Sequence, residues 1–398
     1  MQSDLLEHTI ITDTAALAAF CDRLSGAAFI TVDTEFLRES TFWAQLCLVQ
    51  MAGPEEAAII DPLAGDLDLT PFYRLMADER VIKVFHAARQ DIEIFVKQAG
   101  AVPKPLFDTQ IAAMVCGYGD QVSYDQLVSR VTGHQIDKTS RFTDWSRRPL
   151  SAKQVAYAIA DVTYLRDVYL SLSARLAEQD RATWVAEEMA VLSDPQTYQT
   201  HPEEAWQRLK MRVKKPRQLA VLKALAAWRE REAQNRDVPR GRVLKDDAIY
   251  EIALQQPRDV EGLGRLRTIP RGFERSNTAR GILGAIEEAF AVPENELPRL
   301  PRQRSAPEHA SAAAELLKVL LKMVAEEHGV AARIIAGGED LEKIAADDDA
   351  DVAALKGWRR RLFGEQALAL KRGELALSMS RDGIEAINLD RSSRIAAE

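Results

Sequence analysis

The sequence predicts a mixed α/β domain followed by two all-helical domains. In the first half, short β-prone runs precede patterns with helical spacing. From about residue 202 onward the pattern is helical, and a stretch rich in Pro and Arg near residues 293–307 separates two helical segments. A chain of 398 residues is also too long for one typical domain. We therefore place domains at residues 1–193, 202–292 and 308–390.

The elements of the first domain follow from its apolar patterning. Strands are predicted at residues 29–32, 45–51, 57–60 and 81–85. The first three lie close together in sequence, which is typical of antiparallel neighbours. A helix is predicted from Arg89 to Gln98, stopping at Gly100. Further helices are predicted at residues 107–115, 124–131 and 151–177, the last with Ser151 as its N-cap.

Composition restricts the class of protein. Three cysteines without a CxxC pair argue against a disulfide framework and against a cysteine-ligated zinc site. The start, MQSDLLEHTI, lacks the features of a signal peptide, and no apolar run approaches membrane-spanning length. We expect a cytoplasmic protein that does not bind membranes. The net charge of −8 does not indicate nucleic-acid binding, but local charge decides that question.

Four acids and one tyrosine form the strongest chemical pattern. Asp33 and Glu35 are two apart on the first strand, which ends in Asp33-Thr34-Glu35, so their side chains project to the same face. Asp91 lies just inside the helix after the fourth strand. Tyr157 and Asp161 are four apart and share a helical face. Divalent ions prefer oxygen ligands, and a pair of ions about 3.5–4 Å apart can hydrolyse a phosphodiester.

Each part of this pattern also has an ordinary interpretation. An Asp-x-Glu at a strand end is usually a solvated turn, and an acid in a first helical turn is favoured by the helix dipole. A Tyr and an Asp four apart are more often core and surface residues. The joint order, spacing and contexts of the acids favour a functional site.

These residues lie in segments that resemble a known superfamily. Residues 29–36, 81–95 and 145–165 resemble the three exonuclease motifs of the DEDD superfamily. Tyr157-Ala158-Ile159-Ala160-Asp161 matches the tyrosine subclass, because the histidine subclass would have His where Ala156 stands. The stretches 32–36, 45–50, 86–87 and 144–150 further resemble the bacterial ribonuclease D family, with Ala44 a departure where relatives commonly have Pro.

The resemblance implies a ribonuclease H-like mixed sheet with flanking helices. It also implies a catalytic set of Asp33, Glu35, Asp91, Tyr157 and Asp161. The four acids would bind two divalent ions, Mg or Mn, and Tyr157 would hold the attacking water. A phenol with a pKa of about 10 is a poor base at neutral pH, so positioning of the water is favoured over proton abstraction.

Two further residues are weaker candidates for contacts with nucleic acid. Phe36 would stack on a terminal base, or else belong to the core. Lys138 would contact a backbone phosphate, or else be an ordinary solvated lysine. His86 and Trp145 are interpreted as packing residues, and Asp108 as a helix N-cap.

The second predicted domain resembles a known helical module. Residues 203–290 are similar to the helicase-and-RNase-D C-terminal (HRDC) domain, through residues 219–229, 236–239 and 243–249. Many Arg and Lys side chains lie there, and we expect them to bind RNA. Residues 308–390 are interpreted as a second, diverged HRDC-like domain. The linker indicates modular attachment, so removing everything after about Pro202 is expected to leave a folded nuclease domain.

The resemblance implies a 3'→5' exoribonuclease that releases mononucleotides by two-metal-ion hydrolysis. Its expected partner is RNA, namely transfer RNA precursors or other small structured RNAs with 3' tails, and it is expected to act as a monomer in tRNA 3' maturation. One alternative is a DNA 3'→5' exonuclease of the same superfamily, since only contacts to the 2'-OH would discriminate. The other is an inactive RNA-binding protein, which the presence of all four acids and the tyrosine disfavours.

Overall fold

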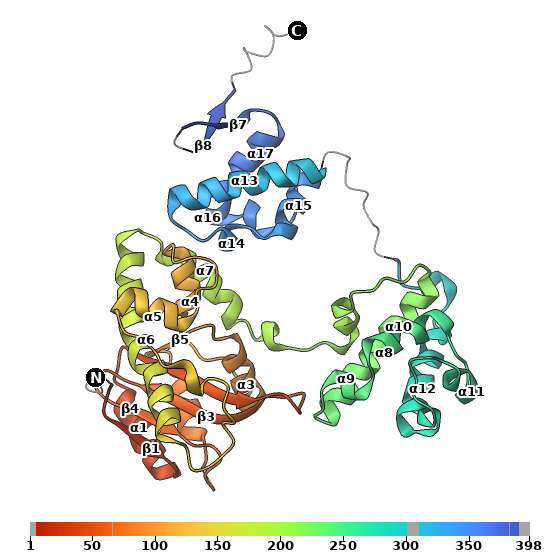
Figure 1. Cartoon of the computed structure of the whole chain (residues 1–398), viewed down its shortest axis with the longest axis horizontal. Coiled ribbons are helices and arrows are strands. Elements are labelled where there is room, and N and C mark those ends of the chain that lie inside the picture. Colours follow the sequence, from red (N-terminus) through yellow and green to blue (C-terminus); the bar gives the residue numbers. More distant parts are fainter. Residues whose placement is uncertain (1–4, 66, 301–309, 382, 390–398) are drawn as a thin grey trace.

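The computed structural model describes residues 5–65, 67–300, 310–381 and 383–389, and it forms three bodies along the chain (Figure 1). The first body is built on a sheet with the strand order β1-β4-β3-β2-β5-β6. The strands are β1 (His8–Ile11), β2 (Phe29–Leu37), β3 (Gln45–Ala52), β4 (Ala57–Ile60), β5 (Ile82–Phe85) and β6 (Leu106–Asp108). The predicted antiparallel pairing of β2, β3 and β4 is confirmed. The other pairs are parallel, so the sheet is mixed.

The two outer strands were not predicted. β1 is mostly exposed, and β6 has only three residues, which is too short for an alternating pattern. The helix predicted from residue 107 therefore begins later, at Thr109, after Asp108 has ended the strand. The side chain of Asp108 accepts a hydrogen bond from the backbone N–H of Gln110, as an N-cap does.

Helices pack against this sheet. They are α1 (Thr14–Leu24), α2 (Thr70–Ala77), α3 (Arg89–Ala99), α4 (Thr109–Val115), α5 (Tyr124–Thr132), α6 (Ala152–Glu178) and α7 (Ala182–Ser193). α3 ends at Gly100, whose φ of 73° is the left-handed conformation that glycine adopts without strain. α6 begins after Ser151, which forms a capping box with Gln154. Ile159 and Val162 of α6 pack against β3 and β4.

The second body has a core of its own. Its helices are α8 (Pro216–Asn235), α9 (Arg240–Val243), α10 (Asp246–Gln255), α11 (Val260–Gly264) and α12 (Asn277–Ala291). It contacts the first body at the β2–β3 loop, where the Asp237 carboxylate accepts hydrogen bonds from the backbone N–H groups of Phe42 and Trp43. The Arg240 guanidinium lies 4.5 Å from the Phe42 ring centroid.

The third body is only partly the helical domain that was predicted. It contains α13 (Ala310–His328), α14 (Ala332–Ile335), α15 (Gly338–Ala346), α16 (Gly357–Arg359) and α17 (Glu365–Lys371). It ends in an antiparallel hairpin of β7 (Leu375–Met379) and β8 (Ile384–Asn388), so the all-helical expectation is wrong there. The Ala and Leu content of this stretch suits a helix, but the pairing of β7 with β8 decides otherwise. Pro301 and Pro307 of the predicted linker lie outside the described residues.

The third body shares its hydrophobic core with the first. Leu317, Ile335 and Trp358 belong to the same cluster of buried side chains as the core of the sheet. Trp358 stacks on Trp184 of α7, with ring centroids 4.3 Å apart and an interplanar angle of 2°. Arg359 forms an ion pair with Glu188 of α7 and donates to the Ile334 carbonyl. Figure 1 shows α13, α14, α15 and α16 of the third body above α4 and α7.

No helix within the described ranges has both the length and the apolar composition needed to cross a bilayer.

Candidate active site

The sheet places two of the predicted acids at its centre. Asp33 and Glu35 lie on β2, which pairs with β3 on one side and β5 on the other. β2 continues to Leu37, with a register shift between Glu35 and Phe36. The expectation that the strand closes at Asp33-Thr34-Glu35 is therefore wrong, and so is the solvated-turn interpretation. Continued pairing with β3 holds both carboxyl groups on a strand buried in the middle of the sheet.

Helix α6 brings a third acid to this strand. One carboxylate oxygen from each of Asp33, Glu35 and Asp161 lies within 4.8 Å of the others. α6 is fixed against β2 by the Thr31 hydroxyl, which donates to the Val162 carbonyl at 2.7 Å. The Tyr157 side chain, one turn before Asp161 on α6, lowers the pKa of the Asp161 carboxyl group against the effect of burial. Thr31 was not found from the sequence, because nothing in a strand pattern shows which helix its hydroxyl meets.

Asp91 lines the same cavity as these three acids but is not one of the residues whose carboxylate oxygens lie within 4.8 Å of one another. It is in the first turn of α3 and is buried, with 7% exposure. The Thr34 hydroxyl, between Asp33 and Glu35 on β2, hydrogen-bonds to its carboxylate. All four predicted acids and Tyr157 thus line one cavity of about 590 Å³. Thr34 is a further site residue that sequence reasoning missed.

Burial raises the pKa values of all four carboxyl groups, and repulsion from neighbouring acids adds to this effect at Asp33, Glu35 and Asp91. Burial is the first cause in each case. It raises the pKa of Glu35 to about 10, helped by Asp33 and Asp161, and that of Asp161 to about 8. The pKa values of Asp33 and Asp91 are also raised well above the ordinary range. Among the described residues, no basic side chain forms an ion pair with any of the four. A cluster of this kind requires positive charge in order to ionise.

The raised pKa values predict how stability depends on pH without metal. The unfolded chain releases these protons near pH 4, whereas the folded protein retains them up to about 8 at Asp161 and about 10 at Glu35. Unfolding therefore releases protons across this window, and the free energy of unfolding contributed by the cluster falls as pH rises. In chelator, Glu35→Gln should flatten the fall in melting temperature between about pH 5 and 8. Parallel curves for the variant and the original chain would contradict the prediction.

The weaker candidates receive mixed outcomes. Phe36 lines the cavity and is also packed against the core, and its stacking on a base stays a prediction. Lys138 lines the cavity too, but its Nζ lies 2.5 Å from the Asp125 carboxylate. Its charge is therefore already paired. Trp145 is a packing residue as predicted, with 2% exposure, and the Nδ1 of His86 lies 3.0 Å from the Thr109 hydroxyl.

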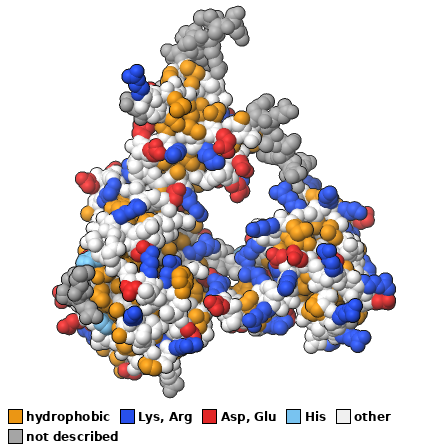
Figure 2. Space-filling view, viewed as in Figure 1, with side chains coloured by type: hydrophobic (Ala, Val, Ile, Leu, Met, Phe, Trp, Pro, Cys, Tyr) orange, Lys and Arg blue, Asp and Glu red, His pale blue; other side chains and the backbone are white. Residues whose placement is uncertain are grey.

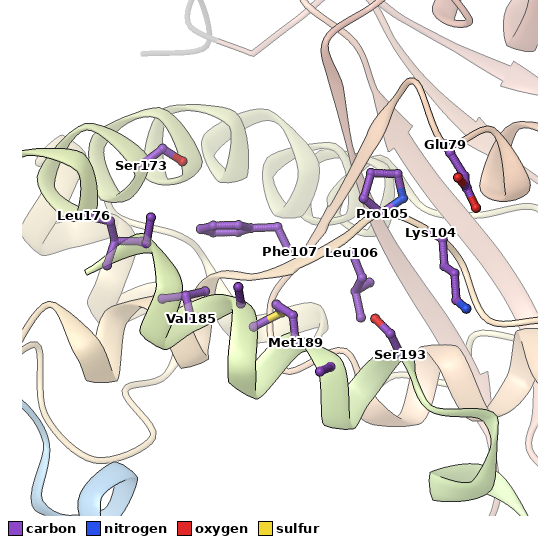
Figure 3. Close-up of a pocket in the computed structure, with 13 residues that line it drawn as sticks. Glu79, Lys104, Pro105, Leu106, Phe107, Ser173, Leu176, Val185, Met189 and Ser193 are labelled. Carbon is purple, nitrogen blue, oxygen red and sulfur yellow. The ribbon is translucent and has the colours of Figure 1, made fainter. Parts of the chain in front are cut away.

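A second cavity of similar volume has different chemistry. It lies between β6, α6 and α7, and Figure 3 shows Leu106 and Phe107 facing Val185 and Met189 across it. Glu79 and Lys104 lie at one end. With a single carboxylate and mostly apolar walls, this groove lacks the ligands that hydrolysis of a phosphodiester requires. The acidic cavity is the candidate active site.

Several basic side chains of the second body form ion pairs or hydrogen bonds within that body. Arg208 and Arg240 form ion pairs with Glu230, whose side chain is 1% exposed, and Arg229 pairs with Asp246. Arg217 donates to the carbonyls at the end of α12. The exposed cations that remain on one segment are Lys210, Arg212, Lys214 and Lys215. Figure 2 shows Lys and Arg side chains along the side of this body that faces the first one.

Comparisons with known proteins show the family of the chain. A 3'-5' exonuclease domain family matches residues 8–177, and the HRDC domain family matches residues 218–286. The chain is 56% identical to the ribonuclease D of Nitrobacter hamburgensis over 96% of its own length and 100% of that protein. It is 52% identical to the ribonuclease D of Acidiphilium cryptum, over 96% and 98% of the two chains.

Among solved structures, Escherichia coli RNase D, described as an exoribonuclease involved in structured RNA processing, is similar with a TM-score of 0.81. The two are 29% identical, and the match covers 92% of this chain and 99% of that one. The HRDC family match ends at residue 286, so the second HRDC-like domain at residues 308–390 stays a prediction.

Proposed function

Because the chain belongs to the ribonuclease D family and is a 3'→5' exoribonuclease, we propose that the acidic cavity is its catalytic centre. Asp33, Glu35, Asp91 and Asp161 are the ligands for two divalent ions, Mg or Mn. The observation that supports this most directly is the convergence of three carboxylates within 4.8 Å, with the fourth in the same cavity.

The residues present fit divalent ions. All four ligands are carboxylates, the hard oxygen donors that Mg and Mn prefer. Their raised pKa values indicate negative charge that the folded protein compensates only in part. When bound, the ions would supply the activation of water and the neutralisation of phosphate charge that hydrolysis requires.

The chain's own residues orient the reactants. Burial raises the pKa of Tyr157 above its ordinary value, so its phenol stays protonated and donates. It lines the same cavity as Asp161, and in the reaction we assign it to holding the attacking water. The Thr34 hydroxyl fixes the Asp91 carboxylate, and the Thr31 bond fixes α6 at the distance that brings Asp161 to β2.

We further propose that the physiological substrates are transfer RNA precursors or other small structured RNAs with single-stranded 3' tails. The exposed cations of residues 210–215 would hold the structured part of such an RNA through its phosphates. The assignment to RNA follows from the family.

The test of this function uses an oligoribonucleotide labelled at its 5' end. With Mg²⁺ or Mn²⁺, the product ladder should shorten one nucleotide at a time from the 3' end, and excess chelator should abolish the reaction. A 3'-phosphate should block degradation, because the cavity is expected to receive a terminal nucleotide with a free 3'-hydroxyl. Internal cuts, or rapid loss of the 3'-phosphorylated RNA, would contradict the proposal.

A further inference from the structure

An exposed aromatic ring stands at the rim of the acidic cavity. Phe142 lines this cavity, yet its side chain is 90% exposed. Exposure of a phenyl ring to water is unfavourable, although a single exposed apolar residue usually needs no explanation. Phe142 differs from such residues because it lies at the rim of the acidic cavity and because the chain on either side of it is held in place by hydrogen bonds and burial.

The segment around Phe142 is fixed on both sides. Ser140 is buried, and its carbonyl accepts hydrogen bonds from the backbone N–H and the hydroxyl of Thr143, at 3.2 and 2.8 Å. The Thr143 hydroxyl also accepts a bond of 3.2 Å from the Gln154 side chain at the start of α6. Trp145, two residues after Thr143, is buried. The local structure therefore places the ring in solvent.

The residue before Phe142 adds an uncommitted positive charge. The Arg141 guanidinium lies 5.2 Å from the Phe142 ring centroid and lines the same cavity. The other three cations of this segment have carboxylate partners: Lys138 with Asp125, Arg147 with Asp144, and Arg148 with Asp61. Within the part of the chain that the structure describes, Arg141 has no ion pair.

We propose that Arg141 and Phe142 form a subsite for the nucleotide next to the 3' terminus, on the 5' side of the bond that is cut. The Phe142 ring stacks on the base of that nucleotide, and the Arg141 guanidinium contacts a neighbouring phosphate. This inference rests on the proposed function, which places the scissile phosphate at the four carboxylates.

The chemistry of a single strand fits this pair. Stacking on an aromatic ring accepts any base, as an enzyme that removes successive nucleotides requires. Each nucleotide also brings one phosphate charge, which a guanidinium can bind. The charge of Arg141 reaches the site, since it lowers the pKa values of Glu35 and Asp161 against the effect of burial.

The test compares Phe142→Ala and Phe142→Trp with the original chain on two labelled single-stranded oligoribonucleotides. One is intact and the other lacks the base at the position next to the 3' end. On the intact RNA, Phe142→Ala should raise KM roughly tenfold with little change in kcat, and Phe142→Trp should retain a low KM. On the RNA without the base, the original chain and Phe142→Ala should have similar KM values.

A matched control is Met379→Ala. Met379 is 88% exposed and lies on β7, away from the cavity, so this variant should keep the KM of the original chain on both RNAs. All variants should share one melting temperature, because Phe142 and Met379 bury almost no surface. For Arg141→Gln, the slope of log affinity against log salt concentration should flatten by about 0.7, as expected for one lost phosphate contact in a single strand.

The outcomes separate the two proposals. If the original chain does not shorten the intact RNA from its 3' end, the proposed function itself is wrong. If it does, but Phe142→Ala behaves like the original chain on both RNAs, the subsite is wrong. Equal losses for Phe142→Ala on both RNAs would also overturn it, because the ring would then act on something other than that base.

Discussion

Asp33→Asn is expected to lower kcat by at least about 10²–10³-fold at matched Mg²⁺, because it removes one charge from the group that must hold the ions and stabilise the transition state. The same change should raise the melting temperature of the metal-free protein above pH 7, since it removes a buried carboxyl group from a mutually repelling cluster. Single-turnover hydrolysis and thermal unfolding in chelator measure the two effects. A lower kcat together with a higher melting temperature would show that the carboxyl groups needed for catalysis destabilise the metal-free fold.

A graded comparison strengthens this experiment. Tyr157→Phe removes one hydroxyl and no charge, so it should lower kcat and leave the affinity for RNA and for Mn²⁺ near their original values. Asp33→Asn should weaken Mn²⁺ binding as well, which calorimetry can detect without any turnover. Full activity of Asp33→Asn, or loss of RNA affinity in Tyr157→Phe with kcat intact, would place these residues outside their assigned roles.

Trp358→Ala is expected to destabilise the nuclease body, although the residue lies almost 200 positions beyond the last proposed ligand. Its ring is 2% exposed and stacks on Trp184 of α7, and the two bodies share one core. Loss of a buried tryptophan costs about 3–5 kcal/mol of the free energy of unfolding. Hydrogen exchange should therefore become faster in α4 and α7 as well as in α13–α17.

The matched control is Leu225→Ala in the second body, whose side chain is fully buried in a separate core. It should speed exchange within residues 202–292 and leave the sheet unaffected. If Trp358→Ala leaves exchange in α7 unchanged, the third body is a detachable module. In that case the truncation after Pro202 would yield the folded nuclease domain that the linker predicts. The shared core favours the opposite result, a truncated chain with exposed apolar surface on α4 and α7.

The sequence predicted the parts of the site that are local. The spacing of Asp33 and Glu35 on a strand, and of Tyr157 and Asp161 on a helix, follows from the periods of the two elements, so their shared faces could be known in advance. The start of α6 at Ser151 and the end of α3 at Gly100 could likewise be predicted, because each depends on the local chemistry of the capping residue. The longer strands, with enough residues to show a pattern, were found, whereas the three-residue β6 was not.

Tertiary structure alone decided how these parts meet. That Thr34 bonds to Asp91, that Thr31 fixes α6, and that Lys138 pairs with Asp125 depend on which elements pack together. The same is true of the hairpin at residues 375–388 and of the core shared by the first and third bodies. A sequence pattern records the period of an element and the face it buries, but it does not record the partner of that face. Partners far apart in the chain are selected by the packing of the whole fold.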